Sequence, residues 1–230
     1  MATRPVFVPL VPARRVAERP VEFVWVPGMA RTQIQKCIRS LHAAATERLR
    51  LDSLLEISTR SERGAGVALS AFNLMIPTTA GPVPVECVYQ SSKLFERGGP
   101  FLDLLTATPR EARADERLTA SGQLVGFIHD SESWGLEPKT CFYDWLYVRA
   151  LAAHPALAAL VARTAGFTDI AFNPERSISC QARSAALYSV LFHTGDLAEA
   201  MSSQRTFIAA HCRAIDKRSV ASDETLFARE

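Results

Sequence analysis

LSAFNLMIPTTAGPVPVECVYQSSKLFE, residues 69–96, is the stretch that decides how this chain folds around its candidate functional residues. Three prolines and a glycine stand between positions 77 and 84, and they exclude a regular helix there because proline lacks the N–H that a helix interior needs. Pro84 itself suits the first turn of a helix. We therefore predict a helix over residues 86–96 that stops at the GGP sequence that follows.

Three polar residues of this predicted helix fall on one face. Glu86, Gln90 and Lys93 lie at positions i, i+4 and i+7, so they would form a stripe about two turns long. A carboxylate, an amide and an amine on one face can bind a hydroxylated, phosphorylated ligand and move protons around it. The alternative is a solvated helix face with a surface ion pair. Spacing alone favours this alternative because such pairs are common.

Outside this stretch, the apolar periodicity predicts several helices and a few short strands. Strands are predicted at residues 21–26, 54–59, 67–72 and 124–129. Longer helices are predicted from Thr32 onward and at residues 139–154, 155–165, 181–195 and 206–215, and short ones on both sides of Pro109 and after Asp196. The first helix would bury Ile34, Cys37, Ile38, Leu41 and Ala45, and the helix at 139–154 would bury Phe142, Leu146 and Ala150.

The length of 230 residues suits one domain. Residues 1–20 contain four prolines and no periodicity, so we predict an extended N-terminal arm. A single domain over residues 21–218 and a frayed tail over 219–230 complete the predicted organisation. The predicted fold class is mainly α, within the α+β class: a helix-rich domain with a few short strands.

Composition and charge exclude several classes of protein. The formal net charge of +2 argues against wrapping a long nucleic-acid backbone, although it leaves room for one nucleotide in a pocket. The five cysteines include no CxxC pair, and the five histidines have no metal-ligand spacing, so we expect neither a metal nor a disulfide framework. No segment approaches the roughly 18 apolar residues of a membrane span, and no signal peptide is recognisable. We expect a cytoplasmic protein.

Two linked motifs resemble the NADAR family. VECVYQSSKLF is similar to the family signature, in which a glutamate precedes an aromatic residue, Gln, two small residues, Lys and an apolar residue. LSAFN stands at the proper distance before it and looks like the family's Leu/Phe-Ser-Asn-Phe segment. SESWGLEPK, the FYDWLYVRALAAHPALAALV helices and FTDIAFNPERSISCQARSAALYSVL resemble later parts of the family, so the similarity covers residues 67–192.

Other features refine this resemblance. The N-terminal extension, EPKTCFYDWLY and NPERSISCQARSAAL look like the branch that partners DarT-type toxins, which attach ADP-ribose to guanosine in DNA. Two positions depart from the family. Cys87 stands where the family often has histidine, and Phe172-Asn173 replaces a Trp-Gly pair. An imidazole at position 87 is therefore excluded from any mechanism. The loop that contains Phe172-Asn173 can contact a ligand differently from the corresponding loop of the family.

The resemblance implies an N-glycosidase that cuts the bond between the anomeric carbon of a ribose and a nucleobase nitrogen. It assigns Glu86 as the proton shuttle, because a carboxylate near that carbon can stabilise developing positive charge and protonate the leaving nitrogen. Lys93 would be either a nucleophile that forms an iminium or an electrostatic anchor. Gln90 would hold a ribose hydroxyl.

The same resemblance indicates candidate ligand contacts. Ser70, Phe72 and Asn73 belong to the LSAFN segment, with Phe72 either stacking on a base or packing in the core. The candidates for the ADP-ribose side are Asp169, Asn173, Gln181 and Arg183. Arg183 would hold the diphosphate or lie on the surface as an ordinary arginine. The charged runs RSERG and PREARADER are interpreted as solvated faces, Trp134 and Trp145 as structural residues, and Tyr89 and Tyr143 receive no role.

Three functions remain open from the sequence. The first is removal of ADP-ribose from guanosine in nucleic acid, as the antitoxin of a DarT-type toxin that could also be a direct partner. The second is the same chemistry on a phosphorylated ribosylamine metabolite of riboflavin synthesis. The third is a non-catalytic module that binds ADP-ribosylated nucleic acid or the toxin. None of them requires a cofactor or a membrane.

Overall fold

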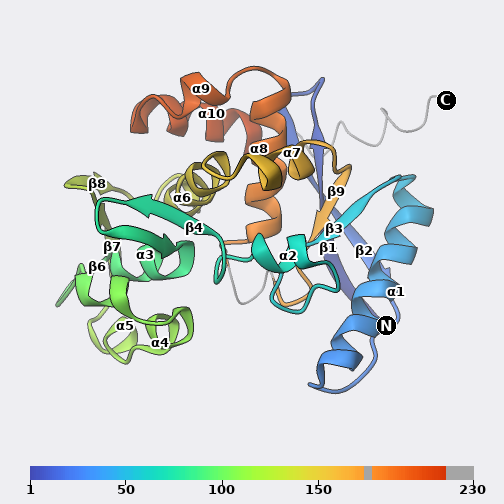
Figure 1. Ribbon diagram of the computed structural model, residues 1–230, viewed down its shortest axis with the longest axis horizontal. Coiled ribbons are helices and arrows are strands. Elements are labelled where there is room, and N and C mark those ends of the chain that lie inside the picture. Colours follow the sequence, from blue (N-terminus) through green and yellow to red (C-terminus); the bar gives the residue numbers. More distant parts are fainter. Residues whose placement is uncertain (174–177, 216–230) are drawn as a thin grey trace.

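The structure, a computed structural model, describes residues 1–173 and 178–215 (Figure 1). The first sheet has four strands in the order β2-β1-β9-β3. Its strands are β1 (Ala2–Leu10), β2 (Arg15–Phe23), β3 (Leu54–Glu56) and β9 (Gly166–Thr168). The long hairpin of β1 and β2 is antiparallel, and β9 pairs antiparallel with β1 and parallel with β3.

Residues 1–20, expected to be an extended N-terminal arm, instead form β1 and most of β2 in this hairpin. Phe7 packs into the core on one face of the sheet, and Val6 and Val8 pack into a second core on the other. A strand covered on both faces lacks the alternation of apolar and polar residues, so the periodicity gave no signal. Pro5 and Pro20 lie opposite each other in the register, which places both missing N–H groups at one rung of the ladder.

Helix α1 (Arg31–Leu49) covers the outer face of this sheet. Four of the five residues predicted to be buried on it, Cys37, Ile38, Leu41 and Ala45, are buried. The strand predicted at 21–26 is confirmed only as the last three residues of β2. The strand predicted at 54–59 is confirmed as the shorter β3.

The strand predicted at residues 67–72 is wrong. Helix α2 (Gly64–Ala68) occupies the first part of this segment, and a turn follows it. Gly66 explains the close packing of α2 on β3, because a Cβ at this position would lie 2.1 Å from the backbone oxygen of Glu56. The turn residues Ser70 and Asn73 bond to each other and to the carbonyl of Val67, which satisfies the end of the short helix.

The deciding stretch folds as a hairpin, a short helix and a strand. The hairpin of β4 (Met75–Thr78) and β5 (Gly81–Pro84) leads into α3 (Val85–Ser91), which ends earlier than predicted. The hydroxyls of Ser91 and Ser92 both bond to the carbonyl of Val88, at 3.0 and 2.7 Å, where the helix ends. Lys93 then begins β6 (Lys93–Phe95). The spacing of Lys93 from Glu86 predicted a helix at this position, but the chain there forms a strand that pairs with residues 124–127.

Strand β6 pairs with β7 (Leu124–His129), which pairs with β8 (Glu132–Trp134). The prediction of a strand at 124–129 is confirmed. Between β6 and β7 lie η1 (Leu102–Thr106), α4 (Pro109–Ala114) and α5 (Arg117–Ala120), as expected on both sides of Pro109. Thr108 and Glu111 form a capping box at the start of α4.

The central helices separate the two larger sheets. Figure 1 shows α6 (Cys141–Ala152) and α8 (Gln181–His193) with the β6–β8 sheet on one side and the four-stranded sheet on the other. Helix α7 (Pro155–Ala162) follows the break at Pro155, and α9 (Leu197–Ala200) and α10 (Gln204–Ile215) follow Gly195. These helices were predicted. Phe142, Leu146 and Ala150 are buried as the spacing indicated.

One buried carboxylate joins three of these segments. Asp144 on α6 accepts hydrogen bonds from Ser184 Oγ on α8 at 2.5 Å and from Thr140 Oγ1 at 2.7 Å. His211 Nε2 on α10 lies 2.9 Å from Asp144 Oδ2. Arg183 lies 3.8 Å from the same oxygen, so a fully buried charge has a cation beside it.

The fold class is mixed α+β, which corrects the expectation of a mainly α protein. Within the described residues, no single helix is long and apolar enough to cross a membrane; α6 and α7 meet that test of length and composition only as a pair bent by 112°. The predicted tail at 219–230 lies outside the described residues.

Candidate active site

A cleft of about 810 Å³ opens beside α3, the α2 turn and the ends of β3 and β9. It brings together most of the residues that the sequence singled out: Ser70, Phe72, Glu86, Gln90, Lys93, Asp169 and Gln181 line it. Asn73, Asn173 and Arg183 are not among its lining residues. Segments separated by about half the chain therefore meet at one cavity.

Glu86 and Gln90 form the buried part of the cleft wall. The backbone N–H of Glu86 bonds to the carbonyl of Ala71 at 2.9 Å, which fixes the start of α3 against the α2 turn. Both side chains are only 6% exposed. Gln90 Nε2 donates to Glu86 Oε1 at 2.9 Å, and Gln90 Oε1 has no hydrogen-bond partner among the described residues. The carboxylate is thus oriented from one side, and the amide oxygen beside it is buried without a hydrogen-bond partner in the part of the chain that the structure describes.

Lys93 reaches the cleft from a strand and not from the third turn of a helix. Its Nζ lies 5.0 Å from the centre of the Tyr89 ring. Burial lowers the pKa of Lys93, the nearby charge of Glu86 raises it, and the charge of Arg113 lowers it further. Partial burial of the amine increases the share of the neutral, nucleophilic form.

Asp169 lies at the end of β9, beside a second buried carboxyl group. Burial raises the pKa of Asp169 to about 6, and burial together with the charge of Asp169 raises the pKa of Glu56 to about 8. Glu56 is bound to Thr168 Oγ1 at 2.6 Å and to the N–H of Ile170 at 3.0 Å. Asp169 is the member of the pair that lines the cleft.

The side-chain amide of Gln181 connects three segments that border the cleft. Its Nε2 donates to the carbonyl of Ile57 at 2.7 Å and to Asp169 Oδ2 at 3.1 Å. Its Oε1 accepts from the N–H of Ala71 at 2.8 Å. The amide is therefore engaged within the protein. From the start of α8 it contacts the α2 turn, Ile57 directly after β3, and Asp169 directly after β9.

Arg183, which we expected to hold a diphosphate, points away from the cleft. It is 9% exposed, and its Nη2 donates to the carbonyl of Ile178 at 3.1 Å. Its guanidinium lies beside Asp144. Arg183 therefore shapes the rim of the cleft by holding the Ile178–Ser179 segment. Ser70 and Asn73 are similarly engaged in the turn that follows α2.

Several residues of the cleft were not predicted from the sequence. Arg60 and Arg113 line it, although both belong to charged runs interpreted as solvated faces. Tyr89, Tyr143 and Trp25 also line it. Both arginines are exposed, and no spacing rule distinguishes them from the arginines of the same runs that lie outside the cleft, because their position depends on the long-range packing of α4 and of the segment after β3. Two cations in a cleft with two carboxylates can bind a phosphorylated ligand.

Within residues 1–173 and 178–215, no group of three or more histidine, cysteine, aspartate or glutamate residues could hold a metal ion. The cleft itself presents the carboxylate of Glu86 and the amine of Lys93. A partly buried amine near a carboxylate suits acid–base or nucleophilic reactions at an electrophilic carbon.

Comparison with known families extends the resemblance beyond the site. A family model described as "DarT1-associated NADAR antitoxin" matches residues 2–220. The match includes the β1–β2 hairpin and α1, which precede the similarity to the wider family at residues 67–192. No curated protein matches the chain. Because the model covers almost the whole sequence, the chain belongs to the family of DarT1-associated NADAR antitoxins.

Proposed function

We propose that this antitoxin is an N-glycosidase that removes ADP-ribose from guanosine in nucleic acid and so reverses the modification made by a DarT-type toxin. The observation that carries the proposal is the meeting of Glu86 and the partly buried Lys93 in a cleft that also contains Arg60 and Arg113. The carboxylate and the amine supply the chemistry, and the arginines supply charge for a diphosphate.

In the direct reaction, the bond between the anomeric carbon and the base nitrogen breaks, and its electron pair goes to the nitrogen. Glu86, as the acid, gives that nitrogen a proton. Water then adds its oxygen to the carbon and returns one proton to Glu86, so the carboxyl group ends as it began. The products are free ADP-ribose and unmodified guanosine.

In the covalent variant, the neutral amine of Lys93 forms a bond to the anomeric carbon as the base leaves with a proton from Glu86. The regenerated carboxylate takes the proton that the amine loses and gives it to the ring oxygen, which receives the electron pair of its bond to the anomeric carbon as the nitrogen lone pair forms the iminium. Water then adds to the iminium carbon, and Glu86 passes a proton from this water to the nitrogen. The amine leaves with the electron pair of the carbon–nitrogen bond, and the aldehyde that remains closes to ADP-ribose. The lowered pKa of Lys93 supports this route because only the unprotonated amine can attack.

The rest of the cleft suits ADP-ribose. Arg60 and Arg113 would pair with the diphosphate. Asp169, which Gln181 holds in place, would accept bonds from ribose hydroxyls. Phe72 offers a ring for the adenine, as does Trp25, which is 39% exposed.

A synthetic oligonucleotide with one ADP-ribosylated guanosine tests the proposal. We expect free ADP-ribose and the intact unmodified oligonucleotide, with loss of release in Glu86→Gln. Binding without release would contradict the enzymatic proposal and indicate a binding module. No binding at all would contradict the nucleic-acid substrate and direct attention to a phosphorylated ribosylamine.

Borohydride distinguishes the two routes. Reduction of an iminium converts it to a stable secondary amine, so the covalent route predicts a protein adduct of the mass of reduced ADP-ribose. The adduct should be absent in Lys93→Ala. Full turnover of the wild-type protein without any adduct would leave the direct route, with Lys93 as a binding residue.

A further inference from the structure

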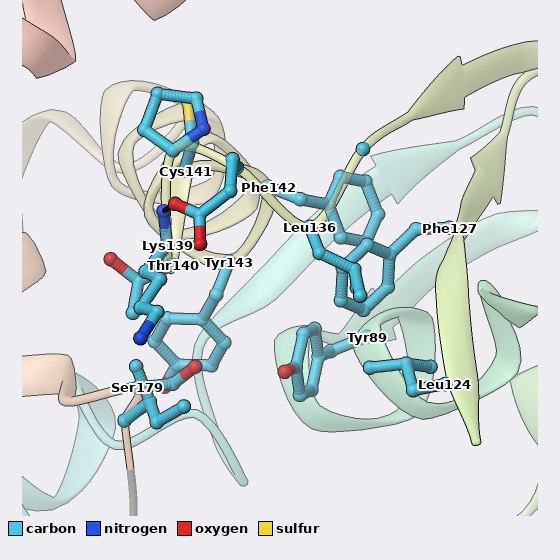
Figure 2. A pocket seen from close by; sticks show the side chains of 14 residues that line it. Tyr89, Leu124, Phe127, Leu136, Lys139, Thr140, Cys141, Phe142, Tyr143 and Ser179 are labelled. Atoms are coloured by element: carbon cyan, nitrogen blue, oxygen red, sulfur yellow. Dashed lines mark hydrogen bonds between the residues drawn. The ribbon is translucent and has the colours of Figure 1, made fainter.

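A second, smaller pocket of about 260 Å³ adjoins the cleft (Figure 2). The two cavities share four lining residues: Tyr89, Tyr143, Ile178 and Ser179. Ser179 hydrogen-bonds to the side chain of Tyr89, and Arg183 holds the carbonyl of Ile178 at 3.1 Å. The common wall is therefore connected by hydrogen bonds to Tyr89 and to Arg183.

One side of this pocket is apolar and largely aromatic. Phe127 stacks on Phe142 with ring centres 4.7 Å apart, and the Tyr89 ring lies 5.5 Å from Phe127. Figure 2 shows Leu124 and Leu136 on this same side. Leu136 is 41% exposed at the rim. Exposed apolar side chains around a hollow are typical of a site that a ligand covers.

The opposite side of the pocket is polar. Figure 2 shows Lys139, Thr140 and Ser179 gathered there, across from Leu136 and Phe127. A ligand that fits has flat apolar faces and a polar edge. A nucleobase has this chemistry: its faces stack on aromatic rings and its edge carries hydrogen-bonding groups.

The pocket lies directly beside the candidate catalytic lysine. Lys93 on β6 is the register partner of Phe127 on β7, and Phe127 lines the pocket. Lys93 Nζ also lies 5.0 Å from the centre of the ring of Tyr89, which lines both cavities. A group in the pocket and a sugar in the cleft would therefore meet next to Lys93.

We propose that the small pocket binds the guanine base that carries the ADP-ribose, so that the leaving group and the sugar occupy separate, adjoining sites. This inference rests on the proposed function for the identity of its ligand. The larger cleft, with its arginines, takes ADP-ribose, and the pocket receives the base once it is unstacked from its neighbours. The bond to be broken then lies at the shared wall, beside Lys93.

Binding measurements on the two halves of the substrate test this without catalysis. The first probe is 2-aminopurine riboside, whose fluorescence falls on stacking, with guanosine as its competitor; the second is ADP-ribose, measured by calorimetry. We expect both halves to bind the wild-type protein at the same time. Mutual exclusion of guanosine and ADP-ribose would overturn the proposal, because it would indicate one site.

A matched pair of variants locates the base. Leu136→Asp, at the exposed rim, should weaken guanosine binding by about tenfold or more, the size expected when the apolar contact of a leucine is lost and a charge takes its place, and leave ADP-ribose binding unchanged. The control is Leu102→Asp, since Leu102 is another exposed leucine, 62% accessible, outside both cavities. Equal thermal unfolding of both variants confirms folding. Unchanged guanosine binding in Leu136→Asp would overturn the proposal.

Two substrates separate the modified base from its neighbours in a strand. Leu136→Asp should lower kcat/KM for the isolated ADP-ribosylated nucleoside as well as for the oligonucleotide. An effect confined to the oligonucleotide would place a neighbouring base in the pocket and overturn the assignment. If the wild-type protein binds both halves but releases no ADP-ribose, the proposed function fails while the pocket assignment stands.

Discussion

Gln90 and Glu86 are joined by a hydrogen bond of 2.9 Å, with both side chains almost fully buried in the wall of the cleft. This contact orients the carboxylate whose proton transfer the proposed reaction needs. Glu86→Gln retains the size of the side chain but removes its acid–base function. We expect the rate of ADP-ribose release to fall by about 10²–10⁴-fold, the range for loss of a general acid.

Glu62→Gln is the control for this variant, because Glu62 forms an exposed ion pair with Arg39 and does not line the cleft. Its rate should match that of the wild-type protein. Single-turnover assays with the modified oligonucleotide measure both variants. A wild-type rate in Glu86→Gln would remove Glu86 from the mechanism.

The charge of Arg113 should contribute to the pH at which Lys93 becomes reactive. Burial lowers the pKa of Lys93, and the like charge of Arg113 lowers it further. In the covalent route, the rate rises with pH as the amine loses its proton. Arg113→Gln removes the repulsion, so the pKa of Lys93 rises. The rising limb of the pH–rate profile then moves to higher pH. Rates of adduct formation across the pH range measure the shift.

Arg110→Gln provides the comparison on the same helix, since Arg110 does not line the cleft. Its pH profile should match that of the wild-type protein. A limb that stays in place in Arg113→Gln, or moves to lower pH, would contradict the role given to the guanidinium. Loss of diphosphate binding alone would change KM without moving the limb.

The sequence predicted the central helices well because their signals are local. Helix α1 shows the spacing of a single buried face, and the break at Pro155 and the stop at Gly195 depend on residues with restricted or permissive backbones. The N-terminal hairpin was not predicted for a different reason. Its two faces are buried by α1 and α8, which are distant in sequence, so the local pattern of a few residues does not indicate this burial.

The sequence predicted which residues line the cleft better than it predicted the elements and orientations that place them there. Lys93 was placed on a helix by its spacing from Glu86, and it reaches the same cleft from a strand because β6 pairs with β7. Arg183 was expected to hold a diphosphate from the start of a helix, but its guanidinium lies beside Asp144 and donates to the carbonyl of Ile178. Arg60 and Arg113 were missed because only the packing of distant segments brings them to the cleft.

Substitution of Asp144 should lower the stability of the protein more than most other substitutions. It accepts bonds from Thr140 and Ser184 and lies beside His211 and Arg183. Asp144→Asn leaves the buried arginine without its counter-charge, so we expect the free energy of unfolding to fall by about 3–5 kcal/mol. Urea denaturation measures the change.

Asp130→Asn is the surface counterpart. Asp130 is exposed and pairs with Arg149 at 3.3 Å, and asparagine tolerates its positive φ of 50°. The cost should be at most about 1 kcal/mol. Equal effects of the two substitutions would contradict the role of Asp144 as the link between α6, α8 and α10.

The paired carboxyl groups Glu56 and Asp169 should make the protein less stable as the pH rises. Burial raises the pKa of Glu56 from its ordinary 4.5 to about 8 and that of Asp169 from 3.8 to about 6. Between these values the folded chain holds protons that the unfolded chain has released. The free energy of unfolding therefore falls with rising pH, by at most about 1.4 kcal/mol per pH unit for each group.

His42 requires a restricted pH window for this measurement. Burial lowers its pKa from 6.5 to about 4, so between these values it contributes the opposite slope. Urea unfolding of the wild-type protein and of Glu56→Gln should therefore be compared from about pH 7.5 to 8.5, about one unit or more above the ordinary histidine pKa of 6.5, where the histidine is neutral in both states. We expect stability to decline across this window in the wild-type protein and to decline less in Glu56→Gln, which has no proton to release at that position. Parallel slopes would mean that Glu56 is already ionised in the folded protein at neutral pH, and the two carboxylates beside the cleft would then both be charged when the substrate binds.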